Sequence, residues 1–133
     1  MKSTNYFDTF ITVSGDCPMA AGKGPAKEGS VAGLQYRLLR ERPYSLTSDD
    51  LLFEIYALRN GVAEPDREKA RKAFFSKPQA CLRASPLVKQ FGWGLHHDEA
   101  GRLAAYGVET AEYRKLAARS DLKVVPGMRN RKS

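Results

Sequence analysis

The chain has 133 residues, of which 42% are hydrophobic and 28% are charged, a composition typical of one compact globular domain. Its apolar runs are far shorter than the roughly 20 residues of a membrane-spanning helix, and its N-terminus lacks the apolar segment of a signal peptide. A formal net charge of +7 favours anionic partners. We therefore expect a cytoplasmic protein with one core and no membrane association.

The first strand is expected at 9–13, where β-branched and aromatic residues precede a turn. A loop rich in Gly, Ala and Lys follows. Its Gly22 and Gly24 suggest a phosphate-binding loop, but Cys17 stands where that pattern needs its first glycine, and Gly24 where it needs Ser or Thr. The phosphate-loop interpretation is therefore rejected.

Three helices are expected next. Ser30 is a candidate N-cap for the first, which Pro43 ends. Ser48 is the predicted N-cap of the second, which stops at Gly61, a residue suited to a left-handed C-cap. A strand over 51–57 stays open as an alternative, because apolar residues also alternate there. Pro65 opens the third helix, which ends near Ser76.

The C-terminal half predicts an antiparallel hairpin, formed by 91–97 and 102–108 around a turn with Gly101 in the left-handed position. A helix over 109–118 and a strand over 122–125 are expected to follow. The remaining residues, 128–133, read as a frayed basic tail.

These elements predict an α+β domain over 1–127, with a small antiparallel or mixed sheet of three to four strands packed with about four helices. No internal repeat or regular strand-helix-strand alternation is found in the sequence.

The cysteines and histidines are the candidate catalytic residues. Cys81 has Lys77 and Arg83 near it in sequence, and cations lower the pKa of a thiol, so an enzyme using Cys81 or Cys17 with His96 is one hypothesis. Adjacent His96 and His97 on a strand should point to opposite faces. No spacing selects a metal site, and we expect no cofactor.

The preferred hypothesis is a small anionic ligand bound by the 76–96 segment. Cationic side chains and hydroxyls are donors for an anion, and a tryptophan between two glycines can offer a flat apolar wall. The predicted ligand-binding residues are Ser76, Lys77, Arg83, Ser85, Lys89 and Trp93.

Nucleic acid binding through the basic segments is a third hypothesis. Five bases and no acid occur from Arg71 to Leu95, and seven bases against Asp121 alone from Arg114 to Ser133. No helix-turn-helix, RNA-binding strand or zinc-finger pattern accompanies that charge.

Several stretches together resemble a family of small bacterial and fungal proteins catalogued only as a domain of unknown function. They are TNYFDTFITVSGDCP, PYSLTSDDLLFEIYALRNG and FFSKPQACLRASPLVKQFGWGLHHDEAGRLAAYGV, followed by the Arg-rich end. The resemblance runs over nearly the whole chain, with Pro78 and His97 departing from it. It implies a single intact domain and carries over no activity, cofactor or catalytic residue.

Overall fold

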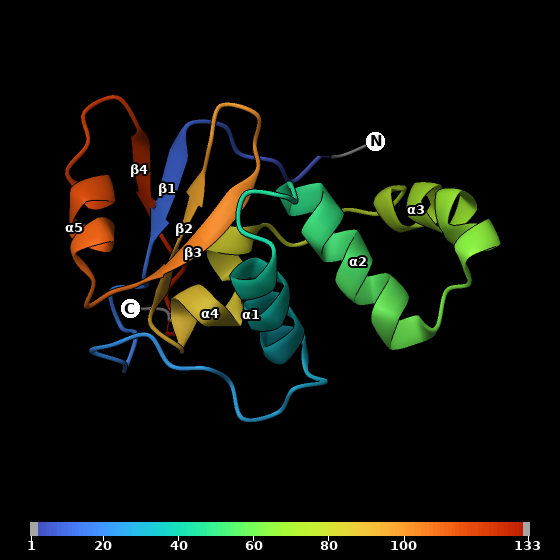
Figure 1. The fold of residues 1–133 in the computed structure, drawn as a ribbon, viewed down its shortest axis with the longest axis horizontal. Helices are drawn as coiled ribbons and strands as arrows, with labels where there is room; N and C mark the ends of the chain where they lie inside the picture. The colour runs from blue at the N-terminus through green and yellow to red at the C-terminus, as the bar shows by residue number, and fades with distance from the viewer. Residues whose placement is uncertain (1–2, 132–133) are drawn as a thin grey trace.

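The computed structural model describes residues 3–131 and contains a mixed sheet of four strands with helices on both faces (Figure 1). The sheet order is β3-β2-β1-β4, in which β1 is antiparallel to β2 and parallel to β4. The strands are β1 (Thr9–Thr12), β2 (Trp93–His97), β3 (Leu103–Gly107) and β4 (Lys123–Pro126). The predicted α+β class is confirmed.

Five α-helices and two short 3-10 helices join the strands within residues 3–131. They are α1 (Val31–Glu41), α2 (Ser48–Asn60), η1 (Glu64–Asp66), α3 (Arg67–Phe75), η2 (Leu82–Ala84), α4 (Pro86–Lys89) and α5 (Ala111–Ala117). Figure 1 shows α5 on one face of the sheet, α1, α2 and α4 on the other, and α3 beyond α2. In this part of the chain no helix has the length and apolarity needed to span a bilayer.

Both faces of β1 are buried. Phe10 packs with Tyr113 and Leu116 under α5, while Ile11 faces the main core, which α1, α2 and α4 share with the sheet. The short run of β-branched and aromatic residues that predicts a strand over 9–13 therefore forms a strand that is buried on both faces.

Two of the predicted helix ends agree with the structure, while α3 begins at Arg67, after Pro65 in η1. Ser30 caps α1 by accepting from the N–H of Gly33, and Gly61 ends α2 with a φ of 62°. The predicted N-cap Ser48 is wrong, because Thr47 and Asp50 form a reciprocal capping box one residue earlier. The strand alternative for 51–57 is also wrong.

Asp49 is a buried carboxylate, 2% exposed, that ties the N-terminal segment to α2. It accepts hydrogen bonds from the backbone N–H of Thr4 at 2.7 Å, the Thr4 hydroxyl at 2.7 Å and the Ser3 hydroxyl at 2.8 Å. Its own N–H donates to the side-chain oxygen of Asn5. Because a carboxylate is stable in a protein interior only when donors surround it, this arrangement explains why an acid is buried here.

Asp49→Ala is expected to lower the free energy of unfolding by about 2 to 3 kcal/mol, since it leaves buried donors of Thr4 without an acceptor. Asp66→Ala is a matched control, because Asp66 also begins a helix but its side chain makes no capping hydrogen bond. Urea unfolding would measure both. Equal losses in the two variants would contradict a specific role for Asp49.

The basic tail is held where fraying was expected. Met128 donates its N–H to the carbonyl of Arg83 at 2.7 Å, and Asp16 accepts from the backbone N–H groups of Asn130 and Arg131. The tail is ordered because the Asp16 carboxylate, in the turn after β1, accepts hydrogen bonds from it. This contact could not be predicted because Asp16 and the tail are far apart in sequence. Lys132 and Ser133 lie outside the described residues, and the boundary at 127/128 stays a prediction.

His97 has no exposed surface, and neither ring nitrogen has a hydrogen-bond partner within residues 3–131. Its ring packs against Tyr6, with 5.2 Å between the ring centroids. Burial lowers the pKa of His97 to about 4, and the nearby carbonyl groups of Leu95 and Thr9 oppose that shift only in part. The imidazole is therefore neutral in the folded protein near pH 7.

Stability is expected to fall as the pH drops below 6.5. The unfolded chain binds a proton at His97 near pH 6.5 and the folded chain only near pH 4, so protonation favours unfolding throughout that window. The contribution of His97 to this loss between pH 7 and pH 5 is about 2 kcal/mol. Urea unfolding at both pH values would measure it, and His97→Leu should reduce the slope by the part that His97 contributes. An unchanged slope in His97→Leu would contradict the assignment.

Candidate functional site

The six predicted ligand-binding residues lie in several environments. The Ser76 hydroxyl donates to the carbonyl of Ala73 at the end of α3, and Lys77 follows it at the surface. Arg83 donates through Nε to the carbonyl of Pro126 at 2.7 Å. Lys89 ends α4, half-buried.

Ser85 and Trp93 are interior residues. Ser85 caps α4 and is 3% exposed. Trp93 is a buried core residue on β2, its Nε1 donates to the carbonyl of Lys23, and its ring faces the Arg40 guanidinium at 5.2 Å. The six predicted residues thus contact different parts of the chain. That they form one ligand site stays a prediction.

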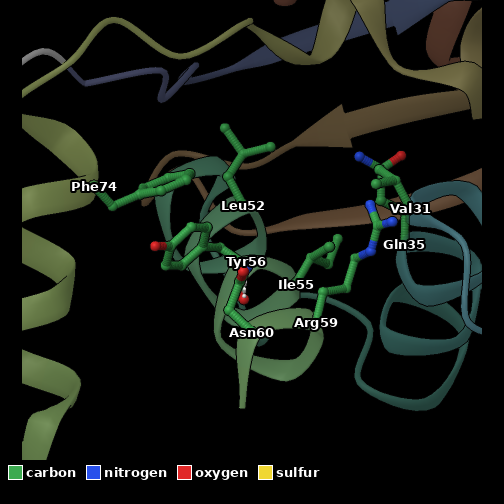
Figure 2. Close-up of a pocket in the computed structure, with 8 residues that line it drawn as sticks. All are labelled: Val31, Gln35, Leu52, Ile55, Tyr56, Arg59, Asn60 and Phe74. Atoms are coloured by element: carbon green, nitrogen blue, oxygen red, sulfur yellow. Dashed lines mark hydrogen bonds between the residues drawn. The ribbon is translucent and has the colours of Figure 1, made fainter. Parts of the chain in front are cut away.

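A groove of about 440 Å³ lies between α1, α2 and α3 (Figure 2). Its apolar lining comes from α1, α2 and α3, and its polar groups come from α1 and α2. Such a combination of apolar walls and a few oriented polar groups is typical of small-ligand sites. The lining residues are Val31, Gln35, Leu52, Ile55, Tyr56, Arg59, Asn60 and Phe74.

Gln35 is the most informative polar group of the groove, because it is 3% exposed and only one end of its amide is bonded. Its Oε1 accepts from the Ser85 hydroxyl at 2.6 Å. The Ser85 oxygen also accepts from the N–H of Leu87, and its single proton is donated to Gln35. The Gln35 NH2 group is therefore the end left to donate into the groove, as Figure 2 shows.

Arg59 adds a cation to the same groove. It stands in the last turn of α2, and it forms no ion pair with an acid in residues 3–131. Figure 2 shows its guanidinium rising toward the wall that carries Gln35. Asn60, in contrast, donates its amide to the carbonyl of Tyr56 at 2.8 Å. The groove thus offers a guanidinium and an amide donor above apolar walls.

Sequence reasoning missed Gln35, although a signal was present. Gln35 is four residues from Val31 and from Leu39, so it falls within the apolar face of the predicted helix. A polar residue in that position is expected to be buried and bonded or to line a cavity. Gln35 does both, because its oxygen is bonded and its nitrogen faces the groove.

His96 and His97 point to opposite faces of the sheet, as expected. On the side of α5, the Tyr44 hydroxyl lies 2.8 Å from His96 Nδ1 and 2.8 Å from the Tyr106 hydroxyl. Burial raises the pKa of Tyr44, with the Tyr106 hydroxyl as the next cause, so this phenol keeps its proton. Burial, and secondly the cation of Arg119, lower the pKa of His96.

The backbone is strained beside this cluster. Tyr44 has a φ of 55° and Asp8 a φ of 47°, and in residues 3–131 these two are the non-glycine residues with positive φ. The Asp8 carboxylate is close enough to His96 to raise its pKa and so oppose the shift. Left-handed backbone at such residues persists only where surrounding contacts enforce it. The hydrogen bonds of the Tyr44 hydroxyl to His96 and Tyr106 are among the contacts that hold Tyr44 in this conformation.

The two cysteines contact different parts of the structure. Cys81 contacts the Tyr6 hydroxyl, and burial followed by that thiol raises the pKa of Tyr6 to about 12. Cys17 follows the strand and donates its N–H to the carbonyl of Ser14. Cys81 therefore approaches the Tyr6 and His97 side of the sheet rather than His96. Residues 3–131 contain no group of three His, Cys, Asp or Glu side chains placed to hold a metal ion.

Comparison with known families assigns the chain over its length, because residues 1–133 match the family of unknown function DUF6157. The chain belongs to the DUF6157 family. Neither a curated protein nor a solved structure matches it. This match confirms the resemblance to a domain of unknown function.

Arg119→Gln is expected to raise the pKa of His96, because it removes a cation that disfavours the imidazolium. A titration of the His96 ring signals by NMR would measure the shift. Arg114→Gln is the control. Arg114 also carries a positive charge and lies in α5, but its guanidinium donates to the carbonyl of Glu109. A lower or unchanged pKa in Arg119→Gln would contradict this electrostatic account.

Proposed function

We propose that the protein binds a small anionic ligand, a carboxylate with an apolar body, in the groove between α1, α2 and α3. The observation that carries the proposal is the Gln35 NH2 group, a donor in a nearly buried side chain whose direction the Ser85 hydroxyl fixes. An orphaned donor of this kind is satisfied by water or by a ligand acceptor.

The positive charge of Arg59 in the groove favours a ligand whose hydrogen-bond acceptor is negatively charged. Arg59 lies at the groove without an acid partner in the described chain, and hydrogen bonds from a guanidinium to a carboxylate are among the strongest in proteins. A structural role for Arg59 also exists, because a cation in the last turn of α2 interacts favourably with the negative end of the helix dipole. That role does not need the amide of Gln35, so the pair of donors favours a ligand.

The apolar walls select the rest of the ligand. Leu52, Ile55 and Val31 present aliphatic surface, and Tyr56 and Phe74 present rings 4.8 Å apart between centroids. A ligand body of hydrocarbon would gain from leaving water there, at about 25 cal/mol per Å² of apolar surface. Both cysteines are free thiols, which fits the proposed location in the cytoplasm.

Calorimetric titration with phenylacetate and octanoate tests the proposal, with phenylacetamide as the uncharged comparison. Arg59→Gln is expected to weaken carboxylate binding by roughly tenfold to a hundredfold, the value of one charge-assisted hydrogen bond. Gln35→Glu keeps an oxygen for Ser85 but replaces the donor with an acceptor, so it should also weaken binding.

Arg114→Gln is the matched control, because it removes the same charge from α5 on the other face of the sheet. It should bind as the unaltered protein does. If Arg59→Gln and Arg114→Gln lost the same affinity for carboxylates, the binding would be explained by general attraction to the net positive charge. Absence of binding by either carboxylate would overturn the proposal.

A further inference from the structure

A second hollow, of about 640 Å³, lies where the C-terminal segment crosses the turn after β1. It shares no lining residue with the groove between α1, α2 and α3. Its walls come from that turn, from the residues that follow α4 and from the described end of the tail. The lining residues are Asp16, Pro18, Gln90, Phe91, Arg129, Asn130 and Arg131.

The tail is anchored at Asn130 by side chains and backbone together. Its backbone N–H donates to both carboxylate oxygens of Asp16 at 3.0 Å, and its side-chain amide donates to Asp16 at 3.2 Å and to the carbonyl of Lys89 at 2.9 Å. The backbone N–H of Arg131 adds a further bond to Asp16 at 3.0 Å. These donors, the N–H of Asn130 first, lower the pKa of Asp16, so the anchor is intact at neutral pH.

This anchor holds the backbone on either side of Asn130, and with it the two arginines that line the hollow together with Phe91. Arg129 and Arg131 flank Asn130 in sequence, and neither is paired with an acid in residues 3–131. Phe91 is half-buried, so part of its ring remains at the hollow. The only acid of the lining, Asp16, is already surrounded by N–H donors. The anchor therefore keeps two positively charged side chains close together despite their mutual repulsion. The result is a cationic site with the Phe91 ring as its apolar side.

We propose that this hollow binds a nucleotide unit, with its phosphate at Arg129 and Arg131 and its base against Phe91. The planar guanidinium groups match phosphate oxygens in two-point hydrogen bonds. Aromatic rings beside a cationic groove are the common means of holding unpaired bases, because every base has a face that stacks. Gln90 supplies an amide for the edge of the base. The proposal stands apart from the groove, because the two sites use different residues.

Calorimetric titration of the full chain with AMP and with ribose 5-phosphate tests the two halves of the site. AMP is expected to bind at least threefold more tightly, because only AMP carries a base. Arg129→Gln and Arg131→Gln should each weaken both ligands about tenfold, and Arg114→Gln should change neither. Phe91→Leu should remove the preference for AMP. Equal binding of the two ligands to the unaltered protein would overturn the role of Phe91, and equal effects of the three arginine variants would overturn the phosphate site.

Asp16→Ala separates a built site from simple attraction. Net charge alone predicts tighter AMP binding, since the variant loses a negative charge. An anchored site predicts weaker binding by several fold, because the arginines lose their fixed position. The side chain of Asp16 lies at the surface of a turn, so the fold should be kept, which a thermal melt would check. AMP binding that is unchanged or tighter in Asp16→Ala would overturn the proposal.

The nucleotide unit could be a free nucleotide or part of a nucleic acid strand. Titration with a labelled single-stranded hexauridylate in the same assay distinguishes the two. Binding many times tighter than that of AMP, with affinity that falls steeply as salt rises, would support the site as one for a nucleic acid strand. Affinity no greater than that of AMP would support a free nucleotide. Failure of both AMP and the hexauridylate to bind would overturn the inference.

Discussion

The four residues of β1 hold the two halves of the chain together. Thr9 pairs with His97 on one side and with Lys123 on the other, so the strand joins segments that are distant in sequence. Closing such large loops costs conformational entropy, which burial of both faces of the strand offsets. What precedes and follows β1 is fixed as a consequence. Thr4 is brought to Asp49 of α2, and Asp16 is brought to the C-terminal tail.

The interior contains polar groups at three levels of satisfaction, and the difference separates structure from function. Asp49 has donors around both carboxylate oxygens, which is the condition for a stable buried charge. His97 has no partner among the described residues but is sealed inside the core, where its lowered pKa keeps it neutral. Gln35 is intermediate, with one end bonded and the other facing a groove. Only the last arrangement has both an unused donor and room for a molecule to accept from it.

Local chemistry made much of the fold predictable. Ser30, Gly61 and Gly101 act within a few residues of their own position, and the structure has them as a cap, a helix end and a turn. The opposite faces of His96 and His97 follow from the period of a strand. The parallel pairing of β4 with β1 was not predictable, because no short pattern specifies which distant strands meet.

The candidate site was less predictable for the same reason. Nearness in sequence grouped Arg83 with Ser85, yet the tight turns of η2 and α4 send one side chain to the carbonyl of Pro126 and the other inward to Gln35. The groove residues come instead from three helices that meet through tertiary packing. The basic and hydroxyl residues of the sequence indicated an anionic ligand. Which donors point into a common groove could be seen only in the folded structure.

The net charge of +7 attracts any anion and therefore cannot by itself distinguish the two proposed sites. Their fixed groups differ in a way that does. The groove between α1, α2 and α3 combines one guanidinium with a nearly buried amide over apolar walls, so burial of hydrocarbon adds to charge there. The hollow at the tail places two exposed arginines beside one ring, so its affinity depends mainly on charge. Because salt screens exposed charges far more than it weakens apolar burial, binding in the groove should persist at salt concentrations that empty the tail site.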